Sequence, residues 1–154
     1  MISLNIMSQS AAKHASYVLA GKTAIISVVN MNDEDPHFHK SDNLIGVLPL
    51  RFDDVTSKED FKMEAEDGEK IREFLRAVLP KIDRLIVHCE YGVSRSAGIA
   101  AVIMKALTGS DIEIFNNPKY VPNMHCYRTT LNALLDEEGN SVLGDHDLKF
   151  SMVG

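Results

Sequence analysis

The sequence predicts an α/β domain in which a central, mostly parallel sheet of about four to five strands has helices on both sides. Short apolar runs rich in β-branched residues are typical of strands buried in a parallel sheet, and they lie at 2–6, 23–29, 45–52 and 85–87. Other stretches have apolar residues at the three- and four-residue spacing of helices. The stretch after residue 95 is apolar on nearly every side, so we expect it to be a central helix.

Length and composition indicate one globular domain, which we expect to span residues 1–154. The chain is 45% hydrophobic and 25% charged, as globular proteins are. No run approaches the roughly 20 apolar residues of a membrane span, and no basic segment followed by an apolar core begins the chain, so we expect a cytoplasmic protein. Cys89 and Cys126 are too few for a disulfide framework.

An alanine-rich helix is predicted from about Ser8 to Leu19, and we expect it to end at Gly21 because glycine is a favoured C-cap. In the next third of the chain, Pro49 favours an edge position or a strand end for the strand at 45–52. A helix with acidic residues early and basic residues late follows over 60–82.

The last third of the chain is predicted to contain helices over 96–107, 111–115 and 124–135. Cys126 lies on the last of these, where we expect it in the core, although a resolving role towards Cys89 is the alternative. The polar tail, residues 137–154, is expected to be loosely packed.

The polar segment at 30–43 has no periodicity and is predicted to be a surface loop. His37 and His39 lie two residues apart in this loop, beside acidic residues, and side chains of these types could bind zinc. We favour a loop without metal, because this spacing is common in loops and no third ligand has the spacing of a known site.

A short loop joins the strand at 85–87 to the central helix and carries both a thiol and a guanidinium. Five residues separate Cys89 from Arg95. A loop this short at a helix N-terminus can turn its backbone N–H groups inward, and the helix dipole adds positive charge, so the cradle selects a compact oxyanion. The same surroundings favour the Cys89 thiolate and lower the pKa of the thiol.

The side chains around the cysteine suit phosphoryl chemistry. Arg95 offers a planar fork for two oxygens of a phosphoryl group. The Ser96 hydroxyl is placed to donate to the sulfur when the thiolate must leave. His88 is expected to orient the loop and the sulfur without reacting itself.

The segment H-C-E-Y-G-V-S-R-S resembles the His-Cys-(five residues)-Arg-Ser/Thr signature of cysteine-dependent protein tyrosine phosphatases, most closely their compact dual-specificity-like branch. The resemblance implies a phosphocysteine at Cys89, phosphoryl binding by Arg95, help in hydrolysis from Ser96, and no cofactor. It also implies a phosphate cradle made by the backbone of Glu90, Tyr91, Gly92, Val93, Ser94 and Arg95. Pro122-Asn123 resembles the Pro-Asn before the last helix of many dual-specificity phosphatases, which makes Asn123 a supporting residue.

Phosphoryl transfer to a thiolate also needs a carboxylic acid that protonates the leaving oxygen and later deprotonates water. Asp53 and Asp54 directly follow the strand at 45–52. In the resembled family the acid lies some thirty-odd residues before the cysteine and is the second member of such pairs, so we choose Asp54. Asp53 is the alternative, and simple turn chemistry would also explain either aspartate.

The predicted function is therefore phosphomonoester hydrolysis by a protein tyrosine or dual-specificity phosphatase, with a phosphorylated protein or a small phosphomonoester as substrate. The chain has no tryptophan and no obvious tyrosine-rich segment to deepen the pocket, which leaves phosphotyrosine, phosphoserine, phosphothreonine and non-protein phosphates open. Phosphatases of RNA 5′ ends or of phosphoinositides are alternatives. The net charge of −6 disfavours nucleic acid and anionic membranes as partners. Position 94 is a further argument against an RNA phosphatase, because asparagine would be expected there in such an enzyme and this chain has Ser94.

Two other classes of protein remain as alternatives. A phosphate-recognition module without turnover usually lacks the cysteine, the arginine or the acid, and here Cys89, Arg95 and Asp54 are all present. A sulfurtransferase also uses a thiolate, but the Arg95-Ser96 pair and the upstream aspartate suit phosphate chemistry better.

Overall fold

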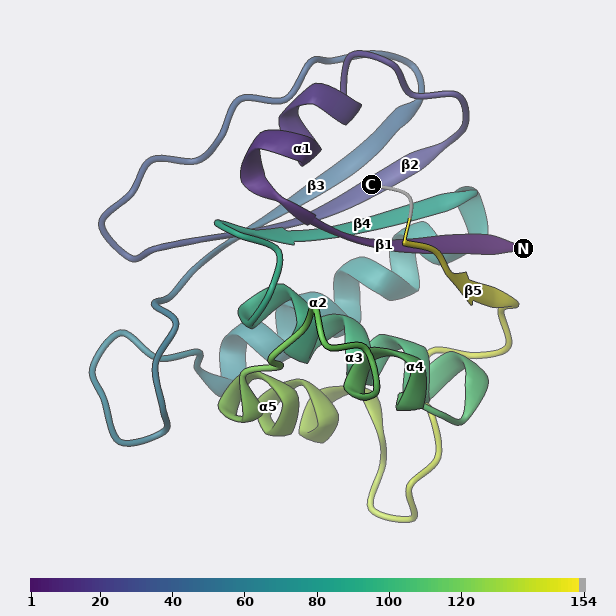
Figure 1. Cartoon of the computed structure of the whole chain (residues 1–154). Coiled ribbons are helices and arrows are strands. Elements are labelled where there is room, and N and C mark those ends of the chain that lie inside the picture. The colour runs from purple at the N-terminus through teal and green to yellow at the C-terminus, as the bar shows by residue number, and fades with distance from the viewer. Residues whose placement is uncertain (153–154) are drawn as a thin grey trace.

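The structure is a computed structural model that describes residues 1–152. Its centre is a sheet of five strands, all parallel, in the order β3-β2-β4-β1-β5 (Figure 1). The strands are β1 (Ile2–Ser8), β2 (Thr23–Val29), β3 (Leu44–Arg51), β4 (Arg84–Cys89) and β5 (Leu148–Phe150). The predicted α/β class with a parallel central sheet is confirmed.

Helices cover both faces of the sheet (Figure 1). One face carries α1 (Gln9–Ala15). The other face carries α2 (Ala65–Val78), α3 (Arg95–Thr108), α4 (Ile112–Phe115) and α5 (Met124–Leu134). Within residues 1–152, no helix has the length and apolar character needed to cross a membrane.

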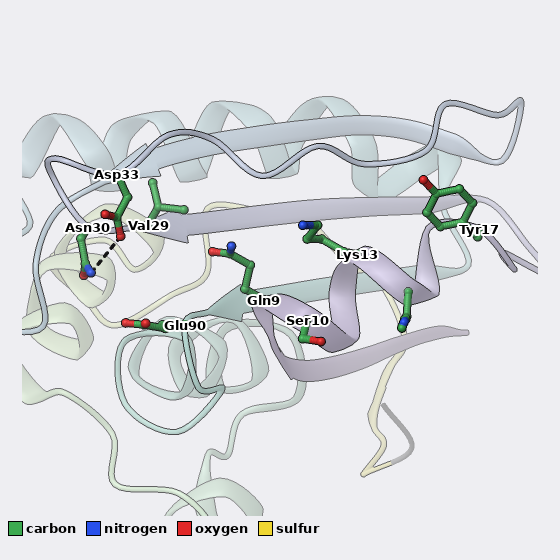
Figure 2. A pocket seen from close by; sticks show the side chains of 9 residues that line it. Gln9, Ser10, Lys13, Tyr17, Val29, Asn30, Asp33 and Glu90 are labelled. Atoms are coloured by element: carbon green, nitrogen blue, oxygen red, sulfur yellow. Dashed lines mark hydrogen bonds between the residues drawn. The ribbon is translucent and has the colours of Figure 1, made fainter.

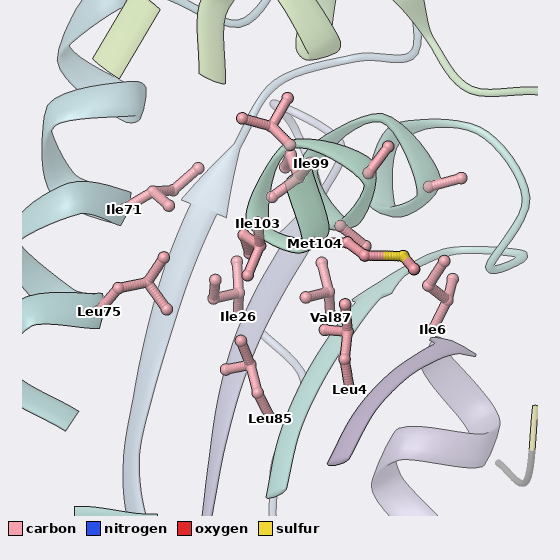
Figure 3. Packing of buried hydrophobic residues seen from close by; sticks show 14 of the residues in the cluster. Leu4, Ile6, Ile26, Ile71, Leu75, Leu85, Val87, Ile99, Ile103 and Met104 are labelled. Atoms are coloured by element: carbon pink, nitrogen blue, oxygen red, sulfur yellow. The ribbon is translucent and has the colours of Figure 1, made fainter. Parts of the chain in front are cut away.

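The main core lies between the sheet and the larger helical layer (Figure 3). The aliphatic side chains of β4 and β2, such as Leu85 and Ile26, meet Ile99 and Ile103 of α3 there. Every residue of α3 from Arg95 to Met104 is buried, as its all-round apolar sequence predicts. A smaller core under α1 contains Met7, Ala12, Ile25, Phe38 and Ile86.

The close contact between α3 and the start of α5 depends on Gly98. A Cβ atom there would lie 2.6 Å from the carbonyl oxygen of Asn123. Glycine therefore lets the two helices approach until the backbone before α5 touches α3, which brings Asn123 towards the sheet edge where α3 begins.

Two helices are shorter than their sequence patterns predict. The first ends at Ala15 rather than near Leu19, where the Ser16 hydroxyl donates to the carbonyl of Lys13 at 2.7 Å and competes with a further helical turn. The helix predicted over 60–82 begins only at Ala65, because the Asp67 carboxylate accepts the backbone N–H of Glu64 at 2.8 Å and fixes the first turn. Pro49 lies in β3, which is an edge strand as expected.

The tail predicted to be loosely packed, residues 137–154, is ordered over part of its length. Its residues Leu148–Phe150 form β5, which pairs with β1 in parallel. Leu148 and Phe150 are buried while Lys149 is exposed, so the alternation of a half-buried strand is present in the sequence but spans only three residues. Residues 153–154 lie outside the described part.

We predict that Phe150→Ala lowers the free energy of unfolding by about 3 kcal/mol, because the ring is 7% exposed and packs edge to face on Tyr120. Urea denaturation measures this difference. Lys149→Ala on the same strand should change the free energy by less than about 0.5 kcal/mol. Equal, small effects of both substitutions would contradict a docked tail.

Candidate active site

The carboxyl ends of four strands meet at one edge of the sheet, where ligands bind in parallel α/β folds. β4 ends at Cys89, which lies beside Ser8 at the end of β1, and His88 lies beside Ser27 of β2. α3 begins six residues after the cysteine, at Arg95. The loop between them is the segment that the sequence predicts to be an anion cradle.

The loop is anchored on the β1 side through Gly92. This glycine has φ +70°, and a Cβ atom on it would lie 2.6 Å from the carbonyl carbon of Met7. The backbone N–H of Gln9 also donates to the carbonyl of Glu90 at 3.1 Å. Glycine is required here both for the left-handed backbone and for the close approach to β1.

On its other side the loop is bonded to the segment before α5. The N–H of Val121 donates to the carbonyl of Val93, and the N–H of Asn123 donates to the carbonyl of Ser94, both at 3.0 Å. Because hydrogen bonds hold the loop on both sides, its backbone has little conformational freedom.

The sulfur of Cys89 lies at the bottom of this loop, and the residue is 3% exposed. Its Sγ is 3.0 Å from the Ser96 hydroxyl oxygen. Burial by itself raises the pKa of the thiol, but hydrogen bonds from the Ser96 side chain and from the N–H groups of Ser96, Gly92 and Val93 outweigh it and lower the pKa of Cys89. The surroundings thus favour a thiolate.

His88 is fully buried, which favours the neutral imidazole. Its Nδ1 lies 3.1 Å from the carbonyl of Cys89, which can only accept, so Nδ1 carries the proton. Nε2 then accepts from the Ser27 hydroxyl at 2.6 Å. Burial is the main cause that lowers the pKa of His88, and the positive charge of Arg95 lowers it further. The hydrogen bond to the carbonyl of Cys89 has the opposite effect and raises it. His88 is therefore placed to orient the end of β4.

Arg95 is 4% exposed and is held through one terminal nitrogen. Nη1 donates to the carbonyl of Phe52 and to Oδ1 of Asn30, both at 2.8 Å. Its Nε is buried and has no hydrogen-bond partner among the described residues. A buried donor without a partner is costly, so this nitrogen is suited to an acceptor from outside the chain.

The two candidate acids have different surroundings. Asp54 accepts at Oδ1 from the Ser94 hydroxyl and from Nδ2 of Asn123, both at 2.8 Å. Asn123 also caps α5, since its Oδ1 accepts the N–H of Cys126. Asp53 instead accepts the backbone N–H of Met31 at 2.9 Å. Asp54 is therefore tied to the anion loop, and Asp53 to the loop after β2.

A cavity of about 280 Å³ brings six of the predicted residues together. It is lined by Asp54, Cys89, Tyr91, Val93, Ser94 and Arg95. The ring of Tyr91 is on its rim, where the residue is 76% exposed.

Glu90 is exposed and lines a different cavity, of about 730 Å³, which runs along α1 (Figure 2). Figure 2 shows the side chains of Gln9 and Lys13 along the helix, with Glu90, Asn30 and Asp33 at one end. No cysteine lines the larger cavity, whereas the smaller one has the Cys89 thiol beside Arg95 and Asp54, so we take the smaller one as the candidate site.

Two other features noted in the sequence, the histidine loop and Cys126, are not part of the site. The His39 ring stacks on Tyr17, with centroids 4.6 Å apart, and within residues 1–152 no group of three or more His, Cys, Asp or Glu side chains is arranged to hold a metal ion. Cys126 is buried in the main core, and burial above all raises the pKa of its thiol, with a further contribution from the charge of Asp54.

The acceptors that hold Arg95 are not among the site residues that the sequence predicts. Asn30 directly follows the buried strand β2, so its position at the carboxyl edge of a parallel sheet was a usable signal. The polar composition of residues 30–43 instead predicts a surface loop there. The Phe52 carbonyl leaves no trace in sequence, because any residue supplies a backbone oxygen.

The fold is that of compact dual-specificity-like phosphatases. The crystal structure of human DUSP28 aligns with a TM-score of 0.60 at 16% identity, covering 82% of this chain and 87% of that one. A variant of DUSP28 aligns with a TM-score of 0.58 at 20% identity, covering 82% and 84%. A mouse protein assigned as a dual specificity phosphatase, complexed with zinc tungstate, aligns with a TM-score of 0.56 at 17% identity, covering 80% and 76%. No protein-family model and no curated protein matches the sequence.

We predict that Gly92→Ala weakens oxyanion binding and lowers the free energy of unfolding by roughly 2–4 kcal/mol, because it adds a clash with Met7 to the cost of the left-handed backbone. Gly139→Ala is the matched control, since Gly139 has φ +82° and open space around it, so only about 1–2 kcal/mol should be lost. Chemical denaturation and tungstate titration measure both effects. Similar losses for the two variants would argue against a tightly packed cradle.

The two thiols should differ in reactivity. Because the pKa of Cys89 is lowered, its alkylation by iodoacetamide should persist as the pH falls below the pKa of an ordinary thiol, and Ser96→Ala should slow it at neutral pH. Cys126, whose pKa is raised, should react only after unfolding and so serves as an internal control. Mass spectrometry of the labelled peptides checks this, and preferential labelling of Cys126 would contradict the assignment.

Proposed function

We propose that the chain is a cysteine-dependent phosphomonoester hydrolase of the protein tyrosine or dual-specificity type. The observation that supports it is one cavity of about 280 Å³ lined by the Cys89 thiol, the Arg95 guanidinium and the Asp54 carboxyl group. The low pKa of the thiol and the unpartnered Nε of Arg95 suit a nucleophile and an oxyanion clamp.

In the first step the Cys89 thiolate attacks phosphorus. The sulfur–phosphorus bond forms, the bond from phosphorus to the ester oxygen breaks, and protonated Asp54 gives its proton to that oxygen, so the alcohol leaves. Arg95 and the N–H groups of the loop, from Glu90 to Ser94, stabilise the equatorial oxygens.

In the second step the Asp54 carboxylate takes a proton from water, and the water oxygen attacks phosphorus. The sulfur–phosphorus bond breaks and inorganic phosphate is released. The Ser96 hydroxyl, 3.0 Å from Sγ, donates to the departing thiolate. The hydrogen bonds from Ser94 and Asn123 to Oδ1 of Asp54 hold the carboxyl group over the site in both steps.

The substrate we propose is a phosphorylated protein or a small phosphomonoester. The cavity is small, and the exposed Tyr91 ring lies on its rim. A reducing compartment such as the cytoplasm suits the chain, because Cys89 and Cys126 are both free thiols.

We predict metal-independent hydrolysis of p-nitrophenyl phosphate in EDTA and reductant, abolished by Cys89→Ser. Asp54→Asn should lower kcat roughly 100-fold with phenyl phosphate and less with p-nitrophenyl phosphate, whose leaving group depends less on a proton. Steady-state kinetics with the two esters measures the difference.

Asp53→Asn is the matched control and should change kcat less than about threefold. It keeps an oxygen to accept the N–H of Met31, just as Asp54→Asn keeps one for Ser94 and Asn123. Tungstate binding without turnover would favour a phosphate-recognition module, and turnover of thiosulfate would favour a sulfurtransferase. Either result would overturn the proposed function.

A further inference from the structure

The hydrogen bonds that hold Arg95 all come from one terminal nitrogen of its guanidinium. A guanidinium is planar and has five N–H donors, two of them on Nη1. Nη1 donates to Phe52 O and to Asn30 Oδ1, both at 2.8 Å, while the buried Nε has no partner within residues 1–152. One acceptor alone would let the guanidinium turn about that hydrogen bond, whereas two acceptors on one nitrogen fix the plane.

The orientation of the Asn30 amide follows from chemistry. Arg95 can only donate, so it needs the amide oxygen, and the Asp33 carboxylate can only accept, so it needs the amide nitrogen. Nδ2 of Asn30 donates to Oδ2 of Asp33 at 3.0 Å. This hydrogen bond is the dashed line in Figure 2. A flipped amide would place two donors together at Arg95 and two acceptors together at Asp33.

The backbone reinforces this arrangement. The N–H of Asp33 donates to the carbonyl of Asn30 at 3.0 Å, which closes a turn directly after β2. Asp33 is exposed at the end of the larger cavity, so its side chain is not needed for the core. The turn thus places a carboxylate where it can fix the Asn30 amide.

We propose that Asn30 and Asp33 are positioning residues for Arg95. Asp33 fixes the amide of Asn30, and Asn30 fixes the guanidinium plane so that Nε faces the oxygens of a bound phosphoryl group. This inference rests on the proposed phosphate chemistry of the site and adds residues outside the Cys89 to Ser96 segment to it.

Tungstate titration by isothermal calorimetry tests the proposal. Asn30→Leu removes the acceptor at similar volume and should weaken tungstate binding about tenfold or more. Asp33→Ala should weaken it about threefold. Removing a negative charge near an anion site would by itself strengthen binding. A loss of affinity in Asp33→Ala would therefore support a positioning role for Asp33. Glu34→Ala removes the same charge from an exposed neighbour and should bind as tightly as the wild type or more tightly.

Two further variants separate positioning from a general structural effect. Asp33→Asn keeps an oxygen that can accept from Nδ2 of Asn30, so it should restore most of the affinity lost in Asp33→Ala. In the double variant Asn30→Leu with Asp33→Ala, the second substitution should cause no further loss, because Asp33 acts through Asn30. Thermal melting confirms that each variant is folded.

Wild-type affinity in folded Asn30→Leu, or equal affinities for Asp33→Ala and Glu34→Ala, would overturn the proposal. Tungstate binding needs no turnover, so the two proposals fail separately. A wild type that binds tungstate but hydrolyses no ester overturns the proposed function, while the predicted order of variant affinities still supports the role of Asn30 and Asp33. A protein that binds no tungstate overturns both.

Discussion

The site depends on the burial of one positive charge whose direct partners are neutral. The guanidinium of Arg95 is 4% exposed, and the acceptors that hold it are an amide oxygen and a backbone carbonyl rather than a carboxylate. Burying a charge costs free energy that hydrogen bonds to neutral groups offset only in part. The remaining positive potential contributes to the lowered pKa of His88, and it makes a bound oxyanion the natural partner of the cavity.

The parallel sheet is what makes this burial possible. Asn30 follows β2, Phe52 follows β3, and Cys89 ends β4, so groups far apart in the chain meet at one edge. The loop after Cys89 is then held between β1 and the segment before α5. Two glycines permit these contacts, Gly92 against Met7 and Gly98 against Asn123. The rigid surroundings hold Cys89, Val93 and Arg95 around one cavity.

The sequence predicted best the features that are local. The Cys89 to Ser96 segment forms one loop and one helix start, so its geometry follows from residue spacing, and the buried strands follow from their apolar runs. Contacts between distant polar residues have no such pattern. The Ser27 hydroxyl meets His88 between the neighbouring strands β2 and β4, and Asn30 meets Arg95 across 65 residues, which only the strand order brings about. The start of α2 and the end of α1 differ from the prediction for the same reason, since Asp67 and Ser16 act through single hydrogen bonds.

The pairing of β5 with β1 has a consequence for synthesis. Ile2 lies beside Leu148, so β1 leaves the ribosome long before the strand that covers its outer edge. Until then that edge exposes unpaired N–H and C=O groups, a template on which another nascent chain can add a strand. Contacts this distant in sequence also slow folding, because the closure entropy of a long loop must be overcome first. Chaperone protection during translation should therefore matter more for this chain than its modest size suggests.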